Sequence, residues 1–115
     1  MDLTKRPRRL RRSEAVRSLV RETSVRVDDL IYPMFVTEGE KIREPIDSMP
    51  GQYRFTVDEL VAECQELWDL GIPAVNLFGY STEKDDMATM AYEPEELIQR
   101  AVRGIKAQVP ELCVQ

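Results

Sequence analysis

Short apolar runs alternate with amphipathic stretches along most of this chain, and this order restricts the fold more than any other feature. Apolar runs of strand length occupy residues 30–36 and 74–78, and a third begins at Leu112. Between them, apolar residues recur every three or four positions over residues 57–68 and 97–105, which is typical of helices with one buried face. Strands separated by helices pair in parallel through right-handed crossovers. The sequence therefore predicts an α/β fold.

Local signals indicate where the helices begin and end. Ser13 is a suitable N-cap for a short helix over residues 14–21. The segment Thr56–Glu59 has the pattern of a capping box, with a hydroxyl at the N-cap and a glutamate three residues later. Gly71 is expected to close this helix, and Pro94 is expected in the first turn of the next one.

The first apolar run also makes a prediction about burial. Residues 30–36 are almost continuously apolar, which predicts a strand buried on both faces. Pro33 has no amide proton, so we expect it at a strand end or at an unpaired position. The turn-rich stretch over residues 37–53 and the polar stretch over residues 81–93 are predicted to be loops, the first longer than a minimal βα connection.

Periodicity alone does not decide how the sheet closes. An open doubly wound sheet and a closed barrel both begin with this order of elements. The glycine-rich phosphate-binding fingerprint of dinucleotide folds is missing, since the turn after the second strand offers only Gly79. A chain of 115 residues is enough for one small domain but is far shorter than the roughly 250 residues of a complete eight-unit barrel. We therefore expect the opening part of a larger α/β domain.

Charge divides the chain into a basic arm and an acidic body. The first 21 residues hold eight of the 16 Lys and Arg residues and only Asp2 and Glu14 as acids, although the net charge is −5. Three roles are open for such an arm: binding a nucleic acid or another anionic surface, docking onto an acidic surface of a partner subunit, or forming a solvated tail. It lacks the interleaved aromatic residues of RNA-binding segments.

Residue types narrow the compartment and the chemistry. Cys64 and Cys113 lie far apart in sequence, which argues against a disulfide framework or a zinc knuckle and favours a reducing cytoplasm. Both cysteines are interpreted as small core residues, and no residue of this chain is predicted to bind a metal. There is no histidine, and no run approaches the length of a membrane span or a secretory signal.

Several short motifs resemble the porphobilinogen synthase (5-aminolevulinate dehydratase) family. They follow in the same order as in that family across nearly the whole chain, so the combination is specific although no single piece is. The matching segments are Arg6–Arg11, Leu30–Gly39, Ser48–Gly51, Leu70–Ile72, Leu77–Gly79, Leu97–Ala101 and Val109–Leu112.

This resemblance implies a (β/α)8 TIM barrel with an extended N-terminal arm. Residues 1–27 would form the basic arm with its short helix, and residues 28–115 would form the first two β/α units and the start of the third strand. The family condenses two molecules of 5-aminolevulinate into porphobilinogen, using two Schiff-base lysines and zinc or magnesium. Its arm wraps a neighbouring subunit, usually within a homo-octamer, so neither nucleic acid nor a membrane is expected as a partner.

The resemblance places little of the chemistry within these residues. The family's catalytic aspartate, metal ligands and both lysines come after Gln115, and no catalytic residue is expected here. The lysines present are not expected to converge in a pocket: Lys5, Lys41, Lys84 and Lys106. Phe78 matches a family phenylalanine that lines the substrate pocket, although a core aromatic at a strand end is an equal alternative. Tyr80 and Ser81 are candidates for the barrel mouth.

Some segments depart from the family pattern. Residues 84–92 lack the usual Gly-Ser pair, and Glu95–Glu96 stands where a glycine is common. The pairs Asp28–Asp29 and Asp85–Asp86 are interpreted as caps or solvated turns. Two functions remain open: the N-terminal part of a porphobilinogen synthase, or a truncated, non-catalytic remnant that binds other subunits of that enzyme.

Overall fold

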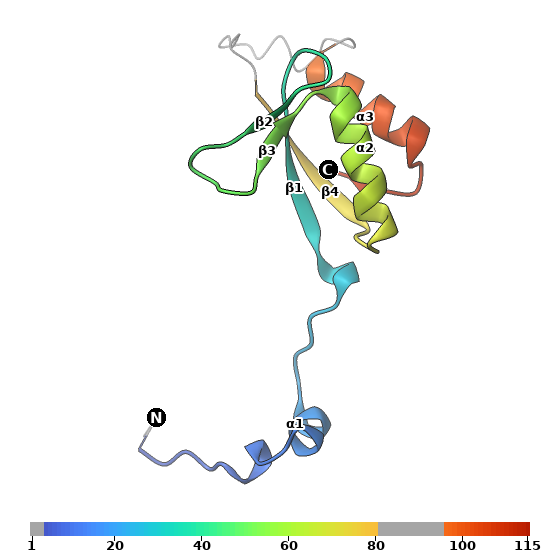
Figure 1. Ribbon diagram of the computed structural model, residues 1–115. Helices are drawn as coiled ribbons and strands as arrows, with labels where there is room; N and C mark the ends of the chain where they lie inside the picture. Colours follow the sequence, from blue (N-terminus) through green and yellow to red (C-terminus); the bar gives the residue numbers. More distant parts are fainter. Residues whose placement is uncertain (1–3, 81–95) are drawn as a thin grey trace, which may run out of the picture.

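The computed structural model describes residues 4–80 and 96–115, and it shows a five-stranded mixed sheet with two helices on one face and a long arm (Figure 1). The strands are β1 (Ile31–Val36), β2 (Arg43–Pro45), β3 (Tyr53–Phe55), β4 (Ala74–Gly79) and β5 (Cys113–Val114). The helices are α1 (Glu14–Val20), α2 (Val57–Asp69) and α3 (Leu97–Gln108), with 3-10 turns η1 (Arg9–Arg11) and η2 (Val27–Asp29).

The sheet has the order β2-β3-β1-β4-β5. β1 pairs in parallel with β4 over six residues, and β4 pairs in parallel with β5, as the alternating sequence predicts. The sheet also contains a part that the sequence does not predict, because β2 and β3 form an antiparallel hairpin that joins the end of β1 through β3. This hairpin lies within and just beyond the stretch over residues 37–53 that was expected to be a loop.

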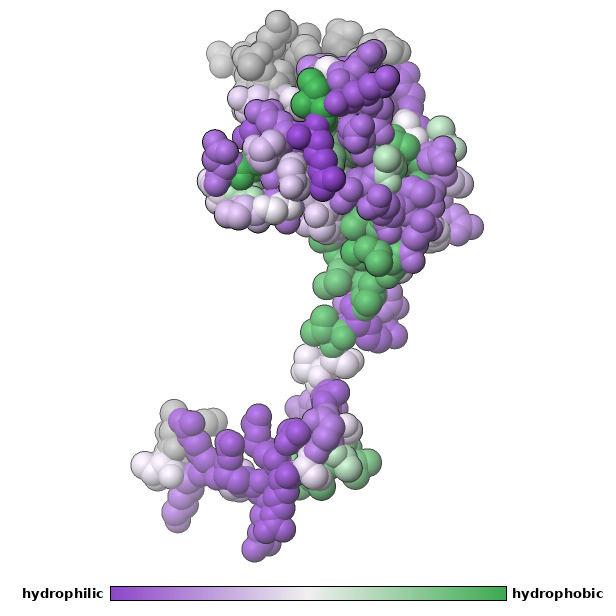
Figure 2. All heavy atoms as spheres, viewed as in Figure 1, coloured by the Kyte–Doolittle hydropathy of each residue, from purple (hydrophilic) through white to green (hydrophobic). Residues whose placement is uncertain are grey.

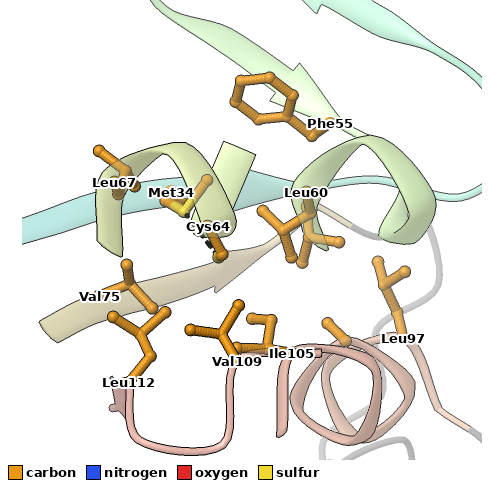
Figure 3. Close-up of a cluster of buried hydrophobic side chains, with 12 residues drawn as sticks. Met34, Phe55, Leu60, Cys64, Leu67, Val75, Leu97, Ile105, Val109 and Leu112 are labelled. Atoms are coloured by element: carbon orange, nitrogen blue, oxygen red, sulfur yellow. Dashed lines mark hydrogen bonds between the residues drawn. The ribbon is translucent and has the colours of Figure 1, made fainter. Parts of the chain in front are cut away.

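One hydrophobic core fills the space between the sheet and the two helices (Figure 3). Met34 and Val36 from β1 and Val75 from β4 meet the apolar stripes of α2 and α3, and all three are almost fully buried. The helix residues that complete this core are Leu60, Cys64, Leu67, Leu97, Ala101 and Ile105, with Val109 and Leu112 after α3. The predicted apolar stripes therefore face the sheet.

The prediction that β1 is buried on both faces is wrong. Exposure alternates along the strand, with Met34 and Val36 buried and Ile31 and Pro33 exposed. A parallel strand is buried on both faces only where both are covered. In the described ranges, helices cover one face of this sheet (Figure 1). Pro33 lies at an unpaired position, as expected. The amide of Thr37 donates to the carbonyl oxygen of Phe55 in β3, and backbone amides alternate in direction along a strand, so the amide position of Pro33 also faces β3. β3 pairs with β1 only from Phe35 onward, so the missing amide proton has no strand partner.

The predicted ends of the helices are mostly confirmed. Ser13 accepts a hydrogen bond from the amide of Val16, as an N-cap should. After α2, Gly71 has a φ of 90°, its amide donates to Trp68 and the amide of Ile72 donates to Leu67. These bonds form a Schellman cap. α3 begins after Glu96, whose side chain caps it, and Pro94 lies outside the described residues.

The predicted capping box at Thr56–Glu59 is wrong. Thr56 is buried, and its hydroxyl donates to the carboxylate of Asp58 at 2.6 Å instead of accepting from a helix amide. The same oxygen accepts from the amide of Ile42 at 3.0 Å. The threonine therefore binds the preceding loop to the start of α2.

The arm extends away from the body, and the longest dimension of the molecule is 59 Å (Figure 1). Hydrophilic side chains cover most of the arm, and apolar ones gather where it meets the body (Figure 2). In α1, Glu14 forms ion pairs with Arg17 and Arg21, which lower the pKa of its carboxyl. At the base of the arm, Val27 and Leu30 are about half exposed. None of the described helices has the length and apolar character needed to cross a bilayer.

Candidate functional site at the carboxyl ends of the strands

One face of the sheet carries the side chains that alternate with the core. We call it the open face and define it by Ile31, Pro33 and Phe35 of β1 and their register partners Ala74, Asn76 and Phe78 of β4. These side chains point away from α2 and α3, because their neighbours in each strand are the ones that enter the core. Any site on this face is therefore built by the same alternation that forms the core.

An aromatic pair lies where β1 and β4 end. Phe35 and Phe78 are register partners, and their rings stack with centroids 5.6 Å apart and an interplanar angle of 28°. Phe78 is 46% exposed, so it is not a buried core residue in the described structure. Ligand sites in parallel α/β folds lie at the carboxyl ends of the strands. The pair is therefore exposed at the end of the sheet where such ligand sites form.

A row of four side chains crosses the sheet at this level. The strand register places Glu44 beside Arg54, Arg54 beside Phe35 and Phe35 beside Phe78. Arg54 lies 3.9 Å from the carboxylate of Glu44, and its guanidinium lies 4.7 Å from the ring centroid of Tyr80. The row therefore combines an apolar surface with one cation and one anion, which is suited to a small polar ligand.

The loop after β1 is held to the two helices that cover the other face of the sheet. The amide of Lys41 donates to the Asp58 carboxylate at 2.9 Å, and Arg100 of α3 donates to Glu38 at 2.6 Å. The hydroxyl of Thr56 together with this amide holds the pKa of Asp58 below its ordinary value. Since hydrogen bonds to a carboxylate favour its ionised form, the loop depends on Asp58 being charged.

The described lysines do not meet. Lys5 is in the arm, Lys41 is in the loop after β1, and Lys106 at the end of α3 donates to the carbonyl oxygens of Pro110 and Leu112. Lys84 lies outside the described residues. Among the described lysines, no pair is therefore arranged for Schiff-base chemistry.

The remaining polar candidates are local. Asp29 accepts from the amide of Arg26 at 2.8 Å, which confirms the interpretation of Asp28–Asp29 as a cap. Ser81, a candidate for the mouth, lies outside the described residues. So do the pair Asp85–Asp86 and residues 84–92.

The two cysteines differ sharply. Cys64 is fully buried as predicted, and its thiol lies 3.6 Å from the sulfur of Met34. Burial, together with the charge of Glu63, raises the pKa of this thiol to about 11. The prediction that Cys113 is a core residue is wrong, because its register partner is Ala74 and it is exposed on the open side of the sheet. Within residues 4–80 and 96–115, no group of three His, Cys, Asp or Glu residues is placed to hold a metal ion.

Sequence reasoning missed Phe35 and Arg54. Phe35 was identified as part of a strand but not as a site residue, although alternation from the following Val36 would have directed it to the opposite face. Arg54 gave no usable signal, because the hairpin that carries it was not predicted. Its neighbours depend on the register of this hairpin with β1.

Comparisons with known proteins agree on one family. A family model described as delta-aminolevulinic acid dehydratase matches residues 4–115. A protein of that name from Halalkalibacterium halodurans is 49% identical over 114 residues, which is 98% of this chain and 35% of the relative. Another from Synechococcus elongatus is 47% identical over 111 residues, covering 96% of this chain and 34% of the relative.

A solved structure agrees as well. It is delta-aminolevulinic acid dehydratase (porphobilinogen synthase) from Toxoplasma gondii, in complex with the reaction product porphobilinogen. The TM-score is 0.87 and the sequence identity is 39%, with 97% of this chain and 32% of that chain covered. The chain thus spans about a third of the length of the proteins it matches.

Proposed function

Because the chain belongs to the delta-aminolevulinic acid dehydratase family, we propose that it is the N-terminal part of a porphobilinogen synthase. The complete enzyme would be a hydro-lyase that condenses two molecules of 5-aminolevulinate into porphobilinogen, a step of tetrapyrrole and haem biosynthesis. The family match over residues 4–115 is the observation that carries this proposal. The exposed aromatic pair at the ends of β1 and β4 supports it independently, because it provides a pocket wall where such folds bind ligands.

The fold proposed for the whole enzyme is a (β/α)8 barrel. In this proposal residues 28–115 supply its first two β/α units and the start of the third strand. The described units support it: β1, β4 and β5 are parallel neighbours, and α2 and α3 cover the same face. The open face would then be the barrel interior, where the apolar side chains of Ile31 and Pro33 would be covered by the remaining strands.

Phe78 is proposed to contact substrate through its ring. The ring is stacked on Phe35, so its orientation is fixed, and its exposed part faces the open side. It offers the methylene carbons of 5-aminolevulinate an apolar surface and helps to exclude water, which lowers the pKa of a nearby Schiff-base lysine. The lysines themselves are proposed to lie outside this chain.

The zinc or magnesium of the complete enzyme is also assigned to residues outside this chain. The described residues do not fit a metal: Cys64 is buried with a raised pKa, and Cys113 stands alone on the open side. We therefore derive no step through the metal. The two unpaired cysteines support a reducing compartment, and the cytoplasm is proposed.

The arm, residues 1–27, is proposed to bind a neighbouring subunit of a homo-oligomer. The oligomer proposed is an octamer. The arm extends away from the body, and Leu10, Leu19 and Val25 are each more than half exposed. Apolar side chains held on an extended basic segment gain stability when a partner covers them.

The test is turnover by the full-length protein that contains this chain. Purified protein is incubated with 5-aminolevulinate, and porphobilinogen is measured with an aldehyde dye that reacts with free pyrroles. We expect turnover in the wild-type protein and a raised KM in Phe78→Ala. Met49→Ala is the control, because Met49 is an exposed apolar residue in the turn between β2 and β3, away from the ends of β1 and β4 in sequence. Absence of pyrrole formation by the metal-loaded wild-type protein would refute the proposal.

Borohydride trapping locates the lysines. Reduction in the presence of 5-aminolevulinate fixes a Schiff base as a stable amine adduct, and peptide mass analysis then identifies the modified residue. We expect every adduct outside residues 1–115. An adduct on Lys41 or Lys106 would show that the assignment of the chemistry to other parts of the enzyme is wrong.

A further inference from the structure

Arg54 joins two parts of the site that are not hydrogen-bonded to each other. It lies in β3, whereas Tyr80 directly follows β4, and β1 separates these two strands in the sheet. The guanidinium reaches past the end of β1 and lies 4.7 Å from the ring centroid of Tyr80. The side chain of Arg54 is 28% exposed, so the contact is partly shielded from water.

In the described structure Tyr80 is held by a backbone hydrogen bond and by the contact with Arg54. Its amide donates to the carbonyl oxygen of Val36 at 2.8 Å, which continues the β1–β4 ladder by one bond. The residue is 52% exposed, and the guanidinium of Arg54 lies over its ring. Tyr80 stands two residues after Phe78 on the same face, so a contact that holds Tyr80 also holds the end of β4 that carries Phe78.

We propose that Arg54 is a positioning residue that clasps hairpin β2–β3 to the end of β4 through Tyr80, and so fixes the Phe35–Phe78 pair in the site. Arg54 is suited to this role because it is the register partner of Phe35 while its guanidinium reaches Tyr80. Glu44, 3.9 Å away, keeps the guanidinium on this face. We call this arrangement the Arg54–Tyr80 clasp. The role extends the function proposed above, and only its kinetic test rests on that function.

The chemistry of arginine explains the choice of residue. A planar guanidinium stacks on an aromatic face, whereas an ammonium group is a compact, strongly hydrated charge. A lysine at position 54 would keep the charge but lose the planar contact. Arg54→Lys therefore separates charge from stacking, and Arg54→Met removes the charge while retaining a long side chain.

The hairpin contains a matched control. Arg43 lies on β2 and its guanidinium is 4.1 Å from the ring centroid of Tyr53 and 5.6 Å from that of Phe55. It is the register partner of Phe55, which faces the core side, so Arg43 lies on the opposite face from Arg54. Arg43→Met removes the same kind of cation–π contact from the same hairpin without touching the open face.

The first measurement is steady-state kinetics of the full-length enzyme with 5-aminolevulinate. We expect Arg54→Met to raise KM by about two- to fivefold, the equivalent of one cation–π contact, with kcat within about twofold of the wild-type value. Tyr80→Leu should have the same effect, and the double variant should be no worse than either single one. Arg54→Lys should recover only part of the loss, and Arg43→Met should have wild-type kinetics.

The second measurement needs no turnover. Hydrogen exchange followed by mass spectrometry reports the protection of the peptide that contains residues 77–80. We expect exchange there to be about two- to fivefold faster in Arg54→Met than in the wild-type protein and unchanged in Arg43→Met. Unchanged exchange in Arg54→Met overturns the clasp, and so does equal loss in both variants.

The outcomes separate the clasp from the proposed function. A fall in kcat without a change in KM would place Arg54 in the chemistry and overturn the positioning role. Additive effects in the double variant would overturn the link to Tyr80. If the wild-type protein does not turn over 5-aminolevulinate, the proposed function fails, and the exchange measurement alone decides the clasp.

Discussion

Gly104→Ala tests how closely α2 and α3 must approach to cover the sheet. A Cβ atom at Gly104 would lie 3.1 Å from Cγ2 of Val61 and 3.5 Å from Cγ1 of Val57. Alanine gains about 0.8–1.0 kcal/mol over glycine in a helix interior. Overpacking costs about 1–3 kcal/mol, and the β-branched Val61 has few rotamers through which to move aside. We therefore expect Gly104→Ala to lower the free energy of unfolding by about 0–2 kcal/mol.

A double-mutant cycle separates the two effects. In a Val61→Ala background the close contact disappears, so Gly104→Ala should stabilise the protein by about 0.8–1.0 kcal/mol, its helix propensity alone. Urea unfolding of the full-length protein followed by circular dichroism measures this difference in the free energy of unfolding. If Gly104→Ala stabilised both backgrounds equally, the reasoning about close helix packing would be refuted.

Three further predictions concern charge, backbone and thiols. The hydrogen bonds that lower the pKa of Asp58 give stability that is present above its ordinary value of 3.8 and lost as the pH falls through the lowered pKa. Asp58→Asn should therefore destabilise the protein at pH 7 and flatten its acid unfolding curve, and equal curves would contradict this. Gly71→Ala should lower the free energy of unfolding in urea by about 1–2 kcal/mol, because a residue with a Cβ is strained at a φ of 90°. Crowding does not add to this effect, since the added Cβ would lie 3.7 Å from Val27. An unchanged free energy of unfolding would exclude backbone strain. The thiol of Cys64 has a pKa of about 11, so at pH 8 only a fraction of about 0.001 of it is thiolate. Mass spectrometry should therefore find Cys64 unmodified by iodoacetamide unless the protein is unfolded. Rapid labelling of the folded protein would contradict the burial of this thiol.

Sequence patterns predicted the parts of the fold that depend on short-range effects. Gly71 ends α2 because only a residue without a Cβ adopts a φ of 90° at little cost, and that requirement is visible in one residue. The stripes of α2 and α3 were visible for a similar reason, since the period of the helix alone selects the buried positions. The resemblance to a family identified Phe78 as a site residue, and the alternation along β4 places its side chain on the open face.

The features that sequence did not predict depend on partners far away in the chain. β3 is only Tyr53–Phe55, and it is stable as a strand because the end of β1 offers it hydrogen-bonding groups. The hydroxyl of Thr56 could cap α2 or bond to the preceding loop. The amide of Ile42 in that loop lies 3.0 Å from the hydroxyl oxygen, so the hydroxyl bonds to the loop. The proposed role of Arg54 depends on distant partners in the same way, because it requires the hairpin, the register with Phe35 and the ring of Tyr80 together.

A single alternation along β1 connects stability with the proposed function. Met34 and Val36 point into the core, while Phe35 between them points to the open face and stacks on Phe78. A shift of β1 by one residue would exchange the two sets, burying Phe35 and exposing the core. The register with β4 prevents this over six residue pairs, so the core packing that holds α2 and α3 to the sheet also fixes the direction in which Phe35 and Phe78 point. The β1–β4 ladder therefore sets the face on which the aromatic pair lies, and the proposed Arg54–Tyr80 clasp acts on the strand ends that carry the two rings.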